Sequence, residues 1–205
     1  GAPTRNGLKR SVEGLTAALQ QQGRPRSSVR LFAMFTVIVE ATSELAAERL
    51  AQLQARASHD GARALLSGWT GVDLSRYQAD DTLSYVDTDA GQSALASFSK
   101  LDPDKVWTVQ DAVDFVTLGG RGPVVAGNPV EVADALQAWV AETGIDGFNL
   151  AYVEMPRTFK NIVELLVPEL QRRGAYKKAY APGTLREKLL EQGQGLAAGH
   201  AGSAY

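Results

Sequence analysis

The stretch that decides the fold is Val29–Val39, VRLFAMFTVIV. It is almost continuously apolar and rich in β-branched and aromatic residues, a pattern typical of a strand buried on both faces in a parallel sheet covered by helices. Its apolar core, Leu31–Val39 with Thr36 inside it, is strand-sized and far shorter than the roughly 18 residues of a membrane-spanning helix. The sequence therefore predicts an α/β protein around this strand.

Amphipathic helices flank this strand in the sequence. Before it, apolar residues recur at helical spacing between Thr4, a candidate N-cap, and Gly23, a candidate terminator. After it, Thr42 is expected to cap a second helix, whose apolar residues continue to Ala57. A buried strand between two such helices is the unit from which parallel α/β folds are built.

The alternation resumes later in the chain. Thr108–Asp111 has the pattern of a capping box at the start of a helix. A short strand is predicted at Pro123–Ala126. Asn128 is then expected to cap the next helix, with Pro129 in its first position and Gly144 at its end.

A third strand and a last helix complete the prediction. The strand is expected at Gly147–Tyr152, and the helix from its N-cap Thr158 to Gly174, with a slight bend at Pro168. The Gly/Ala-rich tail 193–205 is expected to be flexible. This gives one domain over residues 1–192.

The segment 59–104 is too long for an ordinary βα connection, and we interpret it as an insertion. Within it, Ala62–Leu66 predicts a helical turn, Ser67–Leu74 a loop and Ala94–Leu101 a short helix.

Composition bounds the function. The chain has 205 residues, 44% of them hydrophobic, and a formal net charge of −2, which suits a soluble globular domain and favours neither nucleic acid nor a membrane surface as partner. Without cysteine, disulfides, thiolate catalysis and thiolate–metal sites are excluded. With only two histidines, no metal site is expected. The first residues do not resemble a signal peptide, so the cytoplasm is the default expectation.

Candidate site residues follow the predicted strands, because ligands of parallel α/β sheets bind at the carboxyl ends of strands. Gly127 and Asn128 stand where a strand meets a helix N-terminus, which either favours an anion such as a phosphate or is simply a tight turn and cap. Asn149, in a strand expected to be buried, needs a hydrogen-bond partner from a ligand or a neighbouring strand. Tyr152 closes the same strand.

Other chemistry-bearing residues are weaker candidates. Trp69 and Trp107, in predicted loops, either wall a flat aromatic ligand or pack in the core. The glycines of 119–122 precede a strand instead of following one, which disfavours a nicotinamide-binding Rossmann domain and favours a helix C-cap. His59 is expected to be a solvated surface residue. No catalytic acid, base or nucleophile stands out.

The run from Gly120 to Tyr176, GRGPVVAGNPVEVADALQAWVAETGIDGFNLAYVEMPRTFKNIVELLVPELQRRGAY, closely resembles the C-terminal part of flavin-dependent monooxygenases of the nitrilotriacetate and dibenzothiophene-sulfone monooxygenase group, within the bacterial luciferase-like superfamily. The segments ALLSGWTGVDLSRY (64–77) and APGTLREKL (181–189) resemble the same group.

The resemblance implies an α/β fold that is the C-terminal segment of a (β/α)8 TIM barrel, with the three strands as the sixth to eighth and the insertion 59–104 over the barrel mouth. It implies an enzyme that uses reduced FMN, supplied by a flavin reductase, and O2 to oxygenate a small organic substrate. Gly127, Asn128, Asn149 and Tyr152 would border the flavin, with Trp69, Trp107 and Arg157 near the substrate. Arg157 stands where the group usually has glycine, and Asn128 where it has Thr or Ser.

The resemblance also implies that the N-terminal part of the barrel, with the main flavin-phosphate contacts, has no counterpart in this chain. The alternative interpretation is a truncated, non-catalytic luciferase-like module that folds by dimerisation or with a partner chain. Because three βα units cannot close a barrel, we expect a homo-oligomer or pairing with the missing half. That pairing would bury Leu31, Ala33 and Phe35, or the opposite-face residues Phe32 and Met34.

Overall fold

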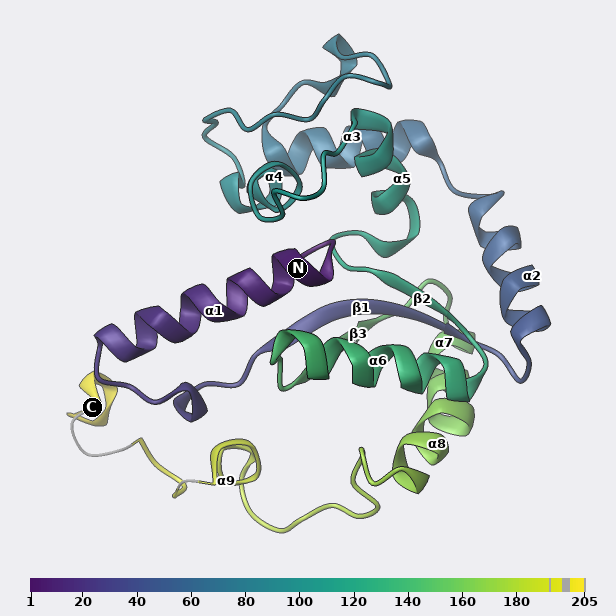
Figure 1. Cartoon of the computed structure of the whole chain (residues 1–205). Helices are drawn as coiled ribbons and strands as arrows, with labels where there is room; N and C mark the ends of the chain where they lie inside the picture. The colour runs from purple at the N-terminus through teal and green to yellow at the C-terminus, as the bar shows by residue number, and fades with distance from the viewer. Residues whose placement is uncertain (192, 197–199, 205) are drawn as a thin grey trace.

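The computed structural model describes all residues except 192, 197–199 and 205. Three strands form one parallel sheet: β1 (Phe32–Val39), β2 (Val124–Gly127) and β3 (Gly147–Ala151). Their order is β2-β1-β3, so β1 runs through the middle of the sheet (Figure 1). The predicted α/β class and the three predicted strands are thereby confirmed.

The position of β1 corrects one expectation. If the strands held consecutive places in a barrel, β2 would lie between β1 and β3, whereas β1 holds that place. With eight residues, β1 is long enough to pair with β3 through its first five residues and with β2 through its last four. Only Thr36 belongs to both ladders.

Helices connect and cover the strands. Their bounds are α1 (Arg5–Gln21), α2 (Ser43–Gln54), α3 (His59–Thr70), α4 (Gln92–Ser99), α5 (Val109–Gly119), α6 (Pro129–Thr143), α7 (Arg157–Asn161), α8 (Val167–Arg172) and α9 (Leu185–Leu190). The predicted N-caps are confirmed at four helices: Thr4, Thr42, Thr108 and Asn128 each accept a hydrogen bond from a first-turn N–H, and the last two form capping boxes.

Two helical predictions are wrong in detail. The expected loop at Ser67 is helical through Thr70, because Gly71 supplies a left-handed C-cap (φ +71°) one turn later. The last helix begins at Arg157 and not after Thr158, whose hydroxyl instead accepts from the Glu154 N–H.

The same helix contains a π-helical segment, Ile162–Leu166, between α7 and α8. The sequence predicts only a slight bend at Pro168. Because Pro168 has no N–H and its ring crowds the preceding turn, the wider π-helical turn just before it relieves the clash. Beyond Gly174, the sequence analysis missed α9, which is too short for a periodic apolar pattern. The predicted flexible tail 193–205 includes 197–199 and 205, which lie outside the described residues.

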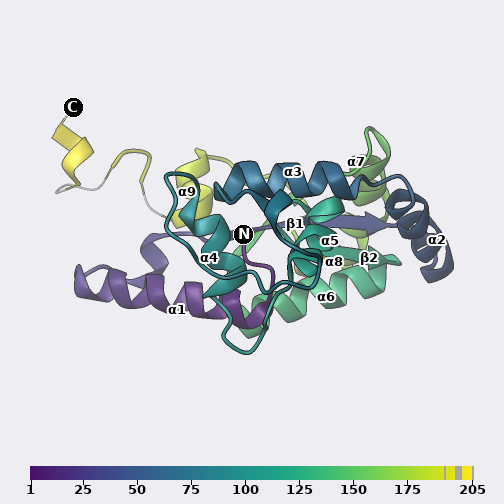
Figure 2. The ribbon, with the colours of Figure 1, turned by 90° about the horizontal axis from the view of Figure 1, so that it is seen from above.

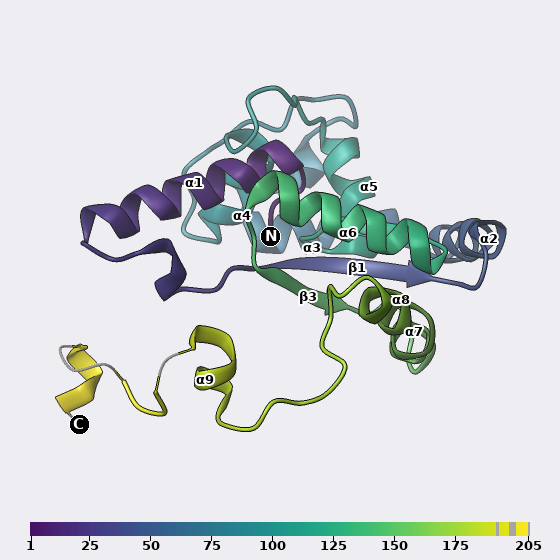
Figure 3. The same ribbon diagram turned by 60° about the horizontal axis from the view of Figure 1, so that its bottom comes forward.

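One face of the sheet carries the main core. Phe35, Val37 and Val39 pack against residues of α1, α6 and the π-helical segment. Trp139 meets Phe35 edge-on with ring centroids 4.9 Å apart, which confirms its predicted place in the core. Helices α1 and α6 run side by side over this core (Figure 3).

The insertion 59–104 and the helix α5 that follows it share a second core, called here the insertion core. Leu66, Leu95 and Val113, from α3, α4 and α5, are fully or almost fully buried among one another and their neighbours. Asp102 joins the insertion to α1 by accepting hydrogen bonds from Thr4 Oγ1 (2.5 Å) and Asn6 Nδ2 (2.8 Å). The three helices form a group above the sheet and α1, away from the end where α2 and α7 lie (Figures 1 and 2).

The 119–122 segment lays β2 against β1. Gly120 caps α5 with φ +59°, as predicted. Gly122 passes so close to β1 that a Cβ on it would lie 2.0 Å from the Met34 carbonyl oxygen. Only glycine permits this approach, after which the Thr36 N–H donates to the Pro123 carbonyl at 2.9 Å.

The two faces of β1 differ in cover. Ala33 and Phe35 are buried within the chain itself, whereas the alternate residue Phe32 keeps 52% of its surface exposed and Met34 is half-buried. Of the two faces of β1 predicted for pairing with another chain, the face with Phe32 and Met34 is therefore the one left partly open. Among the described residues, no helix is long and apolar enough to cross a membrane.

Candidate functional site

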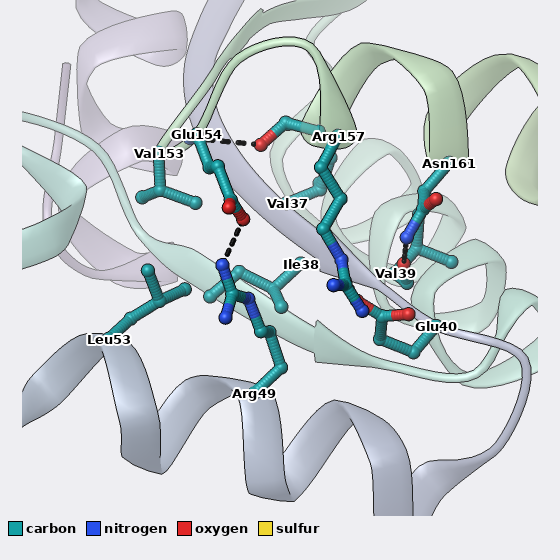
Figure 4. Close-up of a pocket in the computed structure, with 11 residues that line it drawn as sticks. Val37, Ile38, Val39, Glu40, Arg49, Leu53, Val153, Glu154, Arg157 and Asn161 are labelled. Atoms are coloured by element: carbon teal, nitrogen blue, oxygen red, sulfur yellow. Dashed lines mark hydrogen bonds and ion pairs between the residues drawn. The ribbon is translucent and has the colours of Figure 1, made fainter.

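The carboxyl ends of the three strands meet at one edge of the sheet. Glu40 follows β1 directly, and its N–H donates to the carbonyl of Gly127, the last residue of β2, at 3.2 Å. The loop after β3 returns over the same edge and begins α7. A pocket forms here between α2, the end of β1 and this loop (Figure 4).

Glu40 and Arg157 form the first ion pair of the pocket. Glu40 Oε1 accepts from Arg157 Nε at 2.9 Å, and an Nη of Arg157 lies 2.8 Å from the same oxygen as part of the ion pair. The Glu40 side chain is 10% exposed and that of Arg157 is 49% exposed. The glutamate is thus the buried anchor, and the arginine reaches it from the rim of the pocket.

Arg49 and Glu154 form the second ion pair. Arg49 projects from α2, with one Nη bonded to Glu154 and the other donating to Gln52 Oε1 at 2.9 Å. Its side chain is 13% exposed. Arg49 Nε is buried and has no hydrogen-bond partner among the described residues.

Helix α7 is held to the strand end by Asn161. Its Nδ2 donates to the Val39 carbonyl at 2.8 Å, so the first turns of α7 cover the end of β1. The pocket that remains contains a free space of about 10 Å³. Two positive and two negative side chains surround it, so the pocket has no net charge.

The predicted anion site at β2 has the geometry of a helix cap. Asn128 Oδ1 accepts from the N–H groups of Val130 and Glu131, and Asn128 Nδ2 donates to Ser43 Oγ at 2.9 Å. Glu131 Oε2 accepts from the Asn128 N–H and would lie 2.8 Å from a Cβ on Gly127. The first N–H groups of α6 are therefore occupied, and a carboxylate stands where an anion would approach.

The residues predicted on β3 are exposed. The sequence predicts a buried Asn149, but its side chain is exposed, because it lies on the sheet face that the rest of the chain leaves partly open. It shares a sheet face with its register partner Met34. Tyr152, just past the strand, is exposed as well, and its ring lies 5.9 Å from that of Phe159.

The two candidate tryptophans belong to the insertion core or pack against it. Trp107 is buried and meets Phe98 and Phe115 edge-on, with ring centroids 5.1 and 5.6 Å away, which is the core role left open by the sequence. Trp69 is half-buried against the same cluster. Of the predicted site residues, only Arg157 lines the pocket at the strand ends.

Three charged partners of the pocket were missed by the sequence analysis: Glu40, Arg49 and Glu154. Glu40 had a detectable signal, because it is the acidic residue that directly ends the longest apolar run. Arg49 and Glu154 had none, since each is an ordinary charge on a helix or loop. In the part of the chain that is described, no group of three or more His, Asp or Glu side chains is placed to hold a metal ion.

No protein-family model matches the chain. Among curated proteins, it is 38% identical over 173 residues to the dimethyl-sulfide monooxygenase of Hyphomicrobium sulfonivorans, covering 84% of this chain and 36% of that protein. It is 37% identical over 186 residues to the long-chain alkane monooxygenase of Geobacillus thermodenitrificans, covering 91% and 38%.

Solved structures agree with these relatives. The crystal structure of DmoA from Hyphomicrobium sulfonivorans superposes with a TM-score of 0.74 at 34% identity, over 93% of this chain and 40% of that one. Riboflavin lyase (RcaE), solved with modified FMN and riboflavin, superposes with a TM-score of 0.81 at 29% identity, over 94% and 42%.

The chain thus spans about two fifths of the length of the proteins it matches, in keeping with the C-terminal segment predicted from the sequence. The nitrilotriacetate and dibenzothiophene-sulfone monooxygenases are also among its relatives, at 26% and 24% identity. By sequence and by fold, the chain is similar to a segment of the luciferase-like monooxygenases, about two fifths of their length.

Proposed function

We propose that the chain is the C-terminal part of a flavin-dependent monooxygenase and that the carboxyl edge of its sheet borders the reaction cavity. The observation that carries the proposal is a parallel sheet with a polar pocket at its carboxyl edge, between the end of β1 and the loop after β3, in a chain whose relatives are monooxygenases. In such an enzyme, reduced FMN delivered by a flavin reductase supplies the electrons for O2 to oxygenate a small organic substrate.

The flavin phosphate does not fit at the predicted place in this chain. The α6 N-terminus has its first N–H groups occupied by Asn128, and the Glu131 carboxylate would repel a phosphate. We therefore assign the phosphate contacts to the part of the relatives outside this chain. The residues proposed to border the flavin ring or the substrate are Asn149, Tyr152 and Arg157.

In the proposal, these residues contact and orient the flavin ring or the substrate. Tyr152 offers an exposed aromatic face at the end of β3, and Asn149 offers an amide on the open face of the sheet. Arg157 is fixed at the rim by Glu40. No described residue at this edge has the geometry of a general acid or base, so we assign no proton transfer to it.

The test is a titration of the purified chain with FMN and, separately, with riboflavin, followed by flavin absorbance and anisotropy. We expect saturable binding of both flavins, with affinities equal within about twofold because this chain makes no phosphate contact. Tyr152→Ala should weaken both, whereas Tyr176→Ala, an exposed tyrosine after α8, should change neither. Much tighter binding of FMN would overturn the phosphate assignment.

A second candidate is a non-catalytic module that assembles with another chain. It is favoured by the exposed Phe32 ring and by the outer edge of β3, which pairs with no other described strand. If neither flavin binds, and sedimentation shows a dimer that Phe32→Ser dissociates, this second function replaces the first.

A further inference from the structure

The pocket at the strand ends contains hydrogen-bonding groups that the chain itself does not use. Arg49 Nε is buried and unpartnered among the described residues. Leaving a buried donor unpaired is energetically costly, so such a group marks a place where an acceptor from outside the protein is expected.

Arg157 brings a second unused donor to the same place. Its Nε and one Nη are bonded to Glu40, which leaves the other Nη without a described partner. Figure 4 shows the two guanidinium groups, from α2 and from α7, turned toward one gap on either side of Ile38. Ile38 is buried and provides an apolar floor.

The size and charge of the gap restrict its occupant. The free space of about 10 Å³ is roughly what one water-sized group needs. Glu40 and Glu154 already balance the two arginines, so a further anion would be opposed by two carboxylates. An uncharged acceptor accepts the same two hydrogen bonds without that repulsion.

We propose that Arg49 Nε and the free Nη of Arg157 form a two-donor subsite for one uncharged oxygen acceptor of carbonyl type. Glu40 and Glu154 act as positioning residues that aim the two guanidinium groups. The inference rests on the proposed function only in taking the acceptor to belong to the substrate. Its substrate class is then a molecule with a neutral, polar oxygen rather than a hydrocarbon or a carboxylate.

The experiment follows the arginine Nε–H signals of the full ¹⁵N-labelled chain by NMR, without flavin, during titration with acetamide or sodium acetate. We expect a saturable shift of the Arg49 Nε–H signal with acetamide and at most a weaker response to acetate. Arg157→Lys keeps the charge but removes the free Nη, and should weaken acetamide binding about tenfold. Arg5→Lys, at the exposed pair with Glu142, is the matched control and should change nothing.

Each alternative outcome overturns the subsite. A stronger response to acetate means an anion site, and no response to either probe means a site for water only. Equal binding by the wild type and Arg157→Lys removes Arg157 from it. Because the NMR titration contains no flavin, its result is independent of the flavin titration. The chain can bind flavin without the subsite, and the subsite can bind acetamide in a chain that does not bind flavin.

Discussion

The two hydrophobic cores of the molecule are built in opposite ways. The sheet core gathers residues from the N-terminal helix, the central strand and the C-terminal helices, which are distant in sequence. The insertion core draws on one continuous stretch, from Ala62 to Val116. Contacts close in sequence cost less chain entropy to form. The comparison suggests that the insertion is an independent cooperative unit, whereas the sheet depends on both ends of the chain.

The largest expected effect is on the sheet core. Phe35 is fully buried and meets Trp139 and Phe148 edge-on. Phe35→Ala should lower the free energy of unfolding by about 3–5 kcal/mol, measured by chemical denaturation. Phe32→Ala, on the same strand but half exposed, serves as control and should cost well under that amount. If both substitutions lower the free energy of unfolding equally, the two faces of β1 do not differ in burial as described.

Next in size is a substitution in the insertion core. Leu95 is fully buried in α4, so Leu95→Ala should cost about 2–4 kcal/mol. We expect hydrogen exchange to accelerate in α3, α4 and α5 while β1 amides keep their protection. Leu65→Ala, at an exposed position of α3, is the matched control. If β1 loses protection equally, the two cores unfold as one unit and the comparison fails.

A smaller effect is expected at the strand ends, which belong to neither core. Arg157→Ala leaves the Glu40 carboxylate buried without its partner and should cost about 1–2 kcal/mol in thermal or chemical denaturation. Arg5→Ala removes an ion pair that is exposed on both sides and should cost less than about 0.5 kcal/mol. Equal costs would mean that Glu40 is solvated in solution.

The smallest effect concerns the link between the cores. The Thr4 hydroxyl, followed by Asn6, holds the pKa of Asp102 below its usual value. The stabilisation is therefore full above the ordinary carboxyl pKa of about 3.9 and is lost as pH falls below it toward the folded-state pKa. Between pH 5 and 3, the free energy of unfolding of Asp102→Asn should fall less with decreasing pH than that of the wild type, by up to about 1 kcal/mol. Denaturation curves across this range with an unchanged slope would contradict the assignment.

Much of the fold was readable from local sequence. The apolar run at Val29–Val39 predicted the central strand, and the polar caps Thr42 and Asn128 fixed two helix starts, because a cap is satisfied by N–H groups within its own first turn. The glycines at 120 and 144 marked helix ends for the same local reason. The resemblance to the luciferase-like monooxygenases was also carried by sequence alone.

The candidate site was only partly predictable. Arg157 was singled out, but its partner Glu40 lies 117 residues away, and Arg49 is 105 residues from Glu154. The sequence predicts a buried Asn149, whereas its side chain is exposed. The residues of a strand do not by themselves show which face of the sheet the rest of the chain covers. Ion pairs between residues far apart in sequence, and the burial of a strand face, depend on how the helices and strands pack in three dimensions.

The sequence by itself thus determined the three strands, most of the helices and the resemblance to a family, because periodicity, caps and turn residues act within a few residues; α9 and the bounds of α3 and α7 were not among them. Tertiary structure alone decided that β1 lies between β2 and β3, since backbone hydrogen bonds carry no residue code for the partner strand. It also brought two arginines and two glutamates to one pocket. Their proximity arises from the convergence of strand ends at one edge of a parallel sheet, a property of the packed chain and of no single segment.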